Sequence, residues 1–300
     1  IRDPLWSRGL GDVYKRQMRA TQEQIDASSY KPDGEVLRVS KSSYMTYSMC
    51  PRQFYWRYVA DVPSPPPSEA AIRGTIVHSA MEHGILGEPE DMERYLIAEG
   101  MEEDRGAKNL ASLIHSIASD LGSFEVVEAE VKHQVYEEFT TQSGMTPIIW
   151  VGMIDGVLRH PQGGLIVVEL KTGKMNMGKL GRTRKEMVFY SRMLKKMGYD
   201  EVTHFLYLTP DYEVVEGDKL LNEYKKRGKT MWLGENGGYA LLEPVTTRSI
   251  NAFEQGLYDT IDSLKLQDFH MNWNEYFCPV WCDFHLNCES ELTGSIEEWI

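Results

Sequence analysis

Residues 164–174, GLIVVELKTGK, limit the possible folds more than any other stretch of the chain. The aliphatic run at 166–168 predicts a buried strand, because β-branched residues bounded by glycine favour strands. The strand ends with Glu169 and Lys171, whose side chains point to the same face because side chains alternate along a strand. A buried strand therefore carries an acid and an amine side by side at its end, and this pair marks a candidate site.

A second predicted strand, residues 147–160, comes before the first, and HPQGG between them predicts a turn. A hairpin centred near Gln162 sets Asp155 opposite Glu169 to within one residue. Cross-strand Cβ atoms lie about 4.5–5.5 Å apart, so two carboxylates there repel unless a cation lies between them. Mg²⁺ or Mn²⁺ suits such oxygen ligands, and Lys171 would lie beside a metal-bound water. Taken alone, an acid and a lysine at a strand end more often form a surface ion pair, so the prediction depends on the hairpin.

The rest of the pattern predicts an α/β (α+β) fold, a central mixed β-sheet flanked by helices. Helices are expected at 40–59, 69–86, twice within 89–122, at 180–199 and at 246–267, and further strands at 124–139 and 202–210. The last 30 residues show no periodicity and are expected to be irregular. The expected organisation is a flexible N-terminus at 18–37, one domain at 38–290 (helical part 69–122, sheet core 124–245, helix and Cys-rich segment 246–290) and a tail at 291–300.

Residues 1–17 are set apart from this organisation. The sequence DVYKRQ just before Met18 is what GATGTGTATAAGAGACAG encodes in frame, and this DNA resembles a transposon-end adaptor used in sequencing libraries. We interpret residues 1–17 as a non-native, adaptor-derived tail and Met18 as the natural start. A disordered native tail is the alternative.

The composition is that of an ordinary globular protein, with 42% hydrophobic and 26% charged residues. No apolar run reaches the roughly 18–20 residues of a membrane helix. The sequence also lacks a basic segment followed by an apolar core, so we expect a cytoplasmic protein with no membrane partner.

Charge is unevenly distributed along the chain. The net charge of −13 does not indicate a nucleic-acid binder, yet residues 170–196 contain nine Lys and Arg and one acid. Such a stretch favours binding along a phosphate backbone, and we take four of its residues as candidate DNA contacts: Lys174, Lys179, Arg182 and Arg184. The alternative, a solvated helix face, is the commoner explanation of a basic run.

Four segments together resemble the motifs of RecB-like, CRISPR-associated-exonuclease-like nucleases of the PD-(D/E)XK superfamily. They are RGTIVHSAME (73–82), VGMIDGVLR (151–159), VVELKTGK (167–174) and KEMVFYSRML (185–194). The resemblance implies a restriction-endonuclease-like core that cleaves phosphodiester bonds with a bound metal. It also implies roles for His78, Asp155 and Glu169 as metal ligands, for the carbonyl of Leu170 as a further ligand, and for Lys171 as the catalytic lysine.

The family's Gln-x-x-x-Tyr motif differs in this chain. It is Glu186-x-x-x-Tyr190, so the tyrosine is retained and the glutamine is replaced by an acid. The resemblance makes both residues candidates for the catalytic site, and Glu186 also a candidate metal ligand. Without the resemblance, Tyr190 would be a core residue of an amphipathic helix and His78 a packing or surface residue.

The four cysteines have a one-plus-three arrangement: Cys50, then Cys278, Cys282 and Cys288. A cytoplasmic protein gains little from disulfides, so the arrangement suggests metal binding. CPRQFYWRY and WCDFHLNC resemble the split iron–sulfur site of AddB-type and CRISPR-associated relatives, which implies a 4Fe–4S cluster on all four cysteines. The family spacing C-x₂-C-x₅-C is C-x₃-C-x₅-C here. A Zn²⁺ site of the last three cysteines with His285, and free core thiols, are the alternatives.

Together these features predict a metal-dependent deoxyribonuclease, an exonuclease acting on single-stranded DNA or DNA ends. Recombination and repair, phage DNA processing and CRISPR adaptation are the settings to consider, with a helicase, recombination or CRISPR protein as partner. The alternative is a catalytically degenerate DNA-binding subunit that keeps the fold and the metal cluster for structure alone.

Overall fold

The computed structural model describes residues 23, 28–29, 36–86, 89–121, 125–211, 217–234 and 237–294. The expected tail at 1–17, most of the expected flexible segment at 18–37 and the end of the tail at 291–300 lie outside these residues. The chain divides into two compact units. Among the described residues, the first unit comprises 67–133 and 152–253, and the second comprises 36–66, 134–151 and 254–294.

The first unit is built on a mixed sheet, which confirms the predicted fold class. Its strands are β3 (Val126–Thr141), β4 (Gly144–Arg159), β5 (Leu165–Leu170), β6 (Val202–Thr209), β7 (Met231–Leu233) and β8 (Tyr239–Pro244). β4 pairs with β3 and, antiparallel, with β5, so the predicted hairpin is confirmed. β5 runs parallel to β6, β6 antiparallel to β8, and β8 antiparallel to β7. The outer parts of β3 and β4 belong to the second unit.

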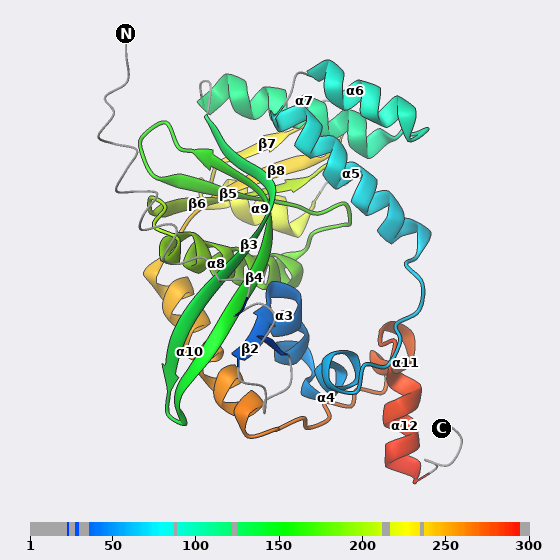
Figure 1. Cartoon of the computed structure of the whole chain (residues 1–300). Coiled ribbons are helices and arrows are strands. Elements are labelled where there is room, and N and C mark those ends of the chain that lie inside the picture. The colour runs from blue at the N-terminus through cyan, green and yellow to red at the C-terminus, as the bar shows by residue number, and fades with distance from the viewer. Residues whose placement is uncertain are drawn as a thin grey trace. The chain divides into compact units, whose positions relative to one another are not determined.

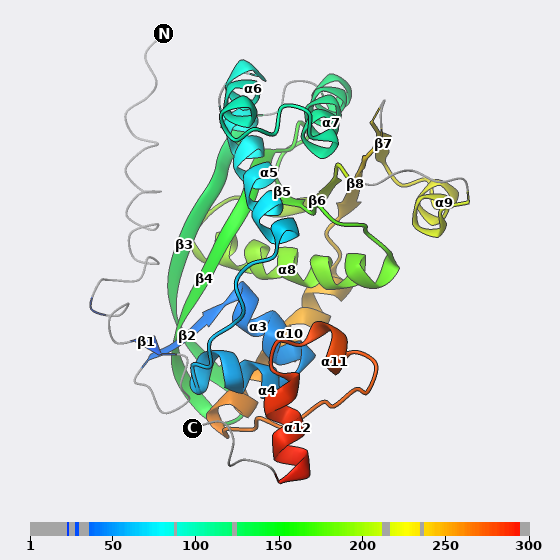
Figure 2. The same cartoon turned by 90° about the vertical axis from the view of Figure 1, so that its right-hand side faces the viewer.

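Helices cover both faces of this sheet. They are α5 (Glu69–Leu86), α6 (Pro89–Ala98), α7 (Arg105–Leu121), α8 (Met177–Lys196) and α9 (Lys219–Lys226). The strands lie between α7 and α8 (Figures 1 and 2). Ile166, Val168 and Leu170 of β5 pack in one core with residues of α5 and α7. Because side chains alternate along a strand, Glu169 points to the opposite face, where α8 packs against β5.

The second unit combines the start and the end of the described chain. Its elements are β1 (Ser28–Ser29), β2 (Val36–Ser40), α3 (Lys41–Met49), α4 (Pro51–Phe54), the π-helical turn η1 (Tyr55–Val59), most of α10 (Thr247–Lys265), α11 (Cys278–Trp281) and α12 (His285–Thr293). β2 runs parallel to β4. Ser40 caps α3 through a reciprocal pair of hydrogen bonds with Ser43, so the serines start this helix as expected.

Aromatic and charged contacts join the two ends of the second unit. The Tyr47 hydroxyl donates to the carbonyl of Asp268 at 2.5 Å, and Phe54 stacks on Phe269. Arg57 pairs with Asp283 at 2.9 Å. The helical segment 41–59 is therefore held against the segment 268–291.

The prediction that the last 30 residues are irregular is wrong in part, because α11 and α12 lie there. Both are short, and neither has an extended apolar period that a sequence pattern can reveal. Within the described segments, no helix has the length and apolar character that crossing a membrane demands.

Candidate active site

The β4–β5 hairpin brings the two predicted acids together. Gly156 pairs with Val168, and one step further in the same register Asp155 lies opposite Glu169. Both side chains are buried, with Asp155 8% and Glu169 2% exposed. One oxygen of Asp155, Oδ2, accepts a hydrogen bond from the backbone N–H of Leu170 at 2.7 Å. The strand end thus holds the Asp155 carboxylate in place through the main chain, while the Leu170 carbonyl stays a predicted ligand.

Lys171 connects two of the buried acids. Its Nζ lies 2.6 Å from Oε1 of Glu169 and 2.9 Å from Oε2 of Glu186. Burial lowers the pKa of Lys171, but the two carboxylates outweigh burial and raise the pKa above its ordinary value. The side chain is therefore an ammonium at neutral pH. Sequence reasoning left the role of Glu186 open, and the structure places this residue on Lys171.

Helix α5 contributes His78 to the same place. Its Nδ1 lies 3.5 Å from Oδ2 of Asp155. Gly74 is one turn earlier, and a Cβ added there would come within 3.3 Å of the Thr172 hydroxyl. The glycine therefore lets α5 approach the end of β5 closely, which gives the Gly-x-x-x-His spacing a physical reason.

Tyr190 is fully buried on α8. A Cβ added at Gly152 of β4 would lie 3.0 Å from Cε1 of Tyr190, so the ring packs directly on this strand. Glu186 lies one helical turn before Tyr190 and is 7% exposed. Helix α8 thus brings both residues of the modified motif to the sheet, with Glu186 at the acids and Tyr190 in the packing beside them.

The charges at this site suit a divalent cation. Asp155, Glu169 and Glu186 are three buried acids, and Lys171 is the ammonium that contacts two of them. Carboxylate oxygens with an imidazole nitrogen are a donor set that Mg²⁺ and especially Mn²⁺ accept. Over the described residues, no three His, Cys, Asp or Glu side chains are grouped closely enough to hold a metal as they stand. The donor types fit the predicted metal, and its coordination stays a prediction.

Three of the four candidate DNA contacts border the acids. Lys174, Lys179 and Arg182 line a cavity of about 320 Å³ together with Lys171 and Glu186. Arg184 lies elsewhere, because its guanidinium makes hydrogen bonds of 2.7–3.0 Å with both carboxylate oxygens of Glu243 on β8. The basic residues of α8 therefore lie on different faces of the helix and do not form one continuous DNA-binding surface.

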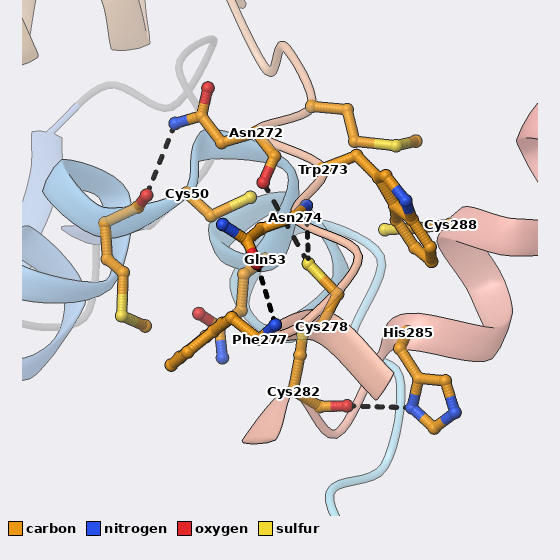
Figure 3. A pocket seen from close by; sticks show the side chains of 12 residues that line it. Cys50, Gln53, Asn272, Trp273, Asn274, Phe277, Cys278, Cys282, His285 and Cys288 are labelled. Carbon is orange, nitrogen blue, oxygen red and sulfur yellow. Dashed lines mark hydrogen bonds between the residues drawn. The ribbon is translucent and has the colours of Figure 1, made fainter. Parts of the chain in front are cut away.

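The four cysteines line a single cavity of about 350 Å³ in the second unit. Cys50 lies between α3 and α4, and the other three come from α11, from the residue after it and from α12. Figure 3 shows these side chains around the cavity, with Trp273 and Phe277 in its wall. All four are free cysteines. The one-plus-three spacing in the sequence thus corresponds to a shared location.

Two of the thiols, Cys282 and Cys288, lie in an environment that disfavours thiolates. Burial raises the pKa of Cys282, and burial raises the pKa of Cys288 to about 11. Asn274 donates its backbone N–H to the sulfur of Cys278 at 3.3 Å. In the alternative ligand set, Nδ1 of His285 lies 3.0 Å from the carbonyl of Cys282 (Figure 3). This contact leaves only Nε2 of that ring for a metal.

A second group of charged residues was not found from the sequence. Glu243, 3% exposed on β8, is surrounded by Arg184, Lys229 and the Tyr207 hydroxyl. No strand had been predicted at 239–244, so nothing indicated that Glu243 faces inward. Strand β8, YALLEP, is buried from Tyr239 to Glu243 and shows no apolar–polar alternation, so the one available signal was the short apolar run before Glu243.

Comparison with known proteins gives one family. The model of the PD-(D/E)XK nuclease superfamily matches residues 38–289. No curated protein matches the chain. Among solved structures, the crystal structure of SSO0001 is similar at 14% identity and a TM-score of 0.38, with 96% of this chain and 97% of that one covered. LHK-Exo in complex with dAMP is similar at 12% identity and a TM-score of 0.29, with 64% and 91% covered.

Proposed function

Since the chain belongs to the PD-(D/E)XK nuclease superfamily, we propose that it is a metal-dependent deoxyribonuclease acting on single-stranded DNA or DNA ends. The observation that best supports this activity is that three buried acids, Asp155, Glu169 and Glu186, lie at one strand end with the half-buried ammonium of Lys171. Three buried carboxylates beside one ammonium destabilise a fold, because their negative charge is only partly balanced. A bound divalent cation would balance that charge, which is why such a cluster indicates a functional site.

Each residue has a role in this proposal. Mg²⁺ or Mn²⁺ would be held by Asp155, Glu169, His78 and the carbonyl of Leu170. When bound, the metal would activate water as the nucleophile and polarise the phosphoryl group. The ammonium of Lys171 would stabilise negative charge that develops on the phosphate oxygens. Glu186 fixes the position of that ammonium. Lys174, Lys179 and Arg182 would bind neighbouring phosphates of the strand.

A catalytically degenerate DNA-binding subunit is the second candidate. The observation that favours it is Glu186 in place of the family's glutamine, because the acid engages the ammonium of Lys171. In that case the chain would bind DNA without cleaving it and would serve a helicase or recombination partner.

Asp155→Asn distinguishes the two candidates. The substitution removes a charged ligand yet keeps the size of the side chain and an oxygen that accepts from Leu170 N–H. Metal binding measured by calorimetry and cleavage of end-labelled single-stranded DNA with Mn²⁺ should both fall, while circular dichroism shows an intact fold. Asp200→Asn, an exposed acid paired with Arg159, is the matched control and should cleave like the parent. A parent protein that binds DNA and leaves it intact with either metal would establish the second candidate instead.

We propose further that Cys50, Cys278, Cys282 and Cys288 bind a 4Fe–4S cluster. Their location around one cavity with apolar walls supports this ligand set, since such clusters are held by four thiolates and shielded from water. A zinc site that uses His285 in place of Cys50 is the competing possibility. Neither metal is needed for the assignment of the acids.

A further inference from the structure

A second cavity, of about 560 Å³, lies against another face of α8 in the first unit. On α8 it is lined by Gly181, Arg184, Lys185 and Val188, which recur at helical spacing and so form one stripe. The cavity beside the acids is lined by the stripe 179, 182, 183 and 186. The two stripes are offset by two residues, a rotation of about 200° on a helix of 3.6 residues per turn. Helix α8 therefore separates two distinct cavities.

The lining of the second cavity is strongly basic. Five cations contribute to it against one carboxylate, Glu243; they are Arg184, Lys185, Arg227, Lys229 and Arg248. Arg184 and Lys229 contact Glu243 at 2.7 and 2.6 Å, and Arg227 pairs with Glu223 outside the lining at 2.6 Å. Within the described part of the chain, no carboxylate lies within ion-pair distance of Lys185 or Arg248. Even after these pairs, the cavity keeps an excess of positive charge.

Glu243 gives this cavity a fixed geometry. It is buried, and both of its oxygens bind the Arg184 guanidinium, which orients that side chain. Lys229 donates to the same carboxylate and also lies 4.7 Å from the centre of the Tyr224 ring. These contacts hold two of the five cations in place before any ligand arrives, which lowers the entropic cost of binding an anion.

The remaining walls indicate what kind of anion fits. The first turn of α10 supplies Arg248 and Ser249, and Thr246 lies just before it, so the positive end of a helix dipole adds to the cationic side chains. Val188, Pro244 and Phe253 form an apolar wall. A cationic side next to an apolar wall suits a molecule that carries phosphate on an apolar, planar body.

We propose that this cavity is a second binding site, which takes the phosphate of a nucleotide, with its base or sugar on the apolar wall. The nucleotide can be free or part of a DNA strand, since the recognised group is the same. The site uses none of the catalytic acids, so it stands apart from the proposed cleavage.

The test measures binding without divalent metal. Lys185→Gln with Arg248→Gln is titrated in EDTA with deoxythymidine monophosphate, inorganic phosphate and a short oligothymidylate. Lys132→Gln with Lys195→Gln removes the same charge at exposed positions that do not line this cavity, and is the matched control. We expect affinity to fall about tenfold or more relative to this control, and the salt dependence on the oligonucleotide to weaken by about 1.4, at about 0.7 per lost contact.

The probes separate the sources of phosphate. If Lys185→Gln with Arg248→Gln lowers the affinity for the mononucleotide, the ligand is a free nucleotide. If it lowers the affinity for the oligonucleotide alone, the ligand is a DNA strand. A third variant, Lys174→Gln with Lys179→Gln, changes the cavity beside the acids. If the mononucleotide loses affinity only in that variant, if Lys185→Gln with Arg248→Gln binds like its control, or if no probe binds the parent, the proposal is wrong. These titrations contain no metal, so their result is independent of cleavage. The second binding site can be disproved while the proposed nuclease activity is confirmed, and the nuclease activity can be disproved while the second site is confirmed.

Discussion

Lys171 is the residue on which the proposed chemistry depends most directly, because its ammonium lies between Glu169 and Glu186. Lys171→Ala leaves every predicted metal ligand in place, so metal affinity measured by calorimetry should be kept. DNA cleavage should fall by about 10²–10³-fold, the size expected when one preorganised stabilising group is lost. Lys195→Ala, on the exposed end of α8, is the control. Near-normal cleavage by Lys171→Ala would remove this lysine from the mechanism.

Glu243 should make stability depend on pH. Burial raises its pKa, but Lys229 and Arg184 outweigh burial, so its pKa in the folded protein lies below the ordinary value of 4.5. A lowered pKa contributes stability above pH 4.5, and this contribution is lost as pH falls through the folded-state pKa.

Glu243→Gln should therefore reduce the free energy of unfolding at pH 7 by about 1–3 kcal/mol. The lower end is expected, because Arg184 and Lys229 keep about a third of their side-chain surface in water. Urea unfolding should show a nearly constant difference from the parent between pH 7 and pH 5, and a difference that shrinks as the pH falls below 4.5. Glu223→Gln, which breaks the exposed pair with Arg227, should have little effect at any of these pH values. A difference that does not shrink below pH 4.5 would argue against a charged Glu243.

At the residue level, the sequence was informative where a strict period and a turn combined. The position of the turn predicted that Asp155 lies opposite Glu169, and the alternation of side chains along each strand placed both acids on one face. The observed register agrees with this pairing. Neither the turn nor the alternation indicated that Glu186 would contact Lys171 or that Arg184 would pair with Glu243. Both contacts depend on how α8 is rotated on the sheet, and its seven basic residues look alike without that rotation.

Among the elements, the β4–β5 turn sets the register of the acids and contains two glycines with positive φ. Gly163 has φ +97° and open space around it, whereas Gly164 has φ +80° and lies against β6. A Cβ at Gly164 would come 2.5 Å from the Thr203 methyl carbon and 3.0 Å from the carbonyl oxygen of Glu201. A substitution at Gly163 therefore tests the cost of a left-handed backbone alone, and a substitution at Gly164 adds the cost of steric overlap with β6.

Gly163→Ala should reduce the free energy of unfolding by about 1–2 kcal/mol, the cost of a left-handed backbone for alanine. Gly164→Ala should cost a further 1–3 kcal/mol or so, because the carbonyl cannot move as a side chain can. It should also lower metal affinity by shifting Asp155 relative to Glu169. Thermal or urea unfolding with metal titration measures both effects. Equal costs for the two variants would show that β6 yields at this contact.

The elements themselves were predicted best where they are long. Helices α5, α7, α8 and α10 and strands β3, β4 and β6 each extend over enough residues for a period to show. The three-residue strand β7, strand β8 and helix α9 had no prediction, and α11 and α12 were expected to be irregular. Short elements are fixed mainly by tertiary packing, which a local pattern does not contain.

For the whole molecule, the proposed cluster joins parts of the chain that are far apart in sequence. Protein purified without oxygen should be brown, absorb broadly in the blue, and contain more iron than zinc. Cys50→Ala should lose the colour and unfold more easily, because the proposed cluster would hold α3–α4 to α11–α12 within the second unit. Ser48→Ala, an exposed position two residues earlier, should change neither property.

The outcome for zinc is equally definite. A colourless protein that contains one zinc, tolerates Cys50→Ala and loses its metal in His285→Ala would replace the iron–sulfur proposal by the Cys₃His site. The sequence predicted that all four cysteines belong to one site, because their one-plus-three spacing suggests a shared metal centre. It did not reveal the two compact units, since their boundaries at 133/134 and 151/152 cut through continuous strands with no change in composition.

The division into units also affects how the protein is made. The chain passes between them four times from Pro66 to Glu254, so the second unit lacks a segment until the residues after Glu254 are synthesised. Cys50 precedes Cys278 by 228 residues, and at about 5–20 residues per second the ribosome needs roughly 10–45 s to cover them. Throughout that interval one thiol of the cavity exists without the other three. We therefore expect the proposed metal to bind only after Cys288 has been synthesised, and the nascent chain to depend on protection from oxidants until then.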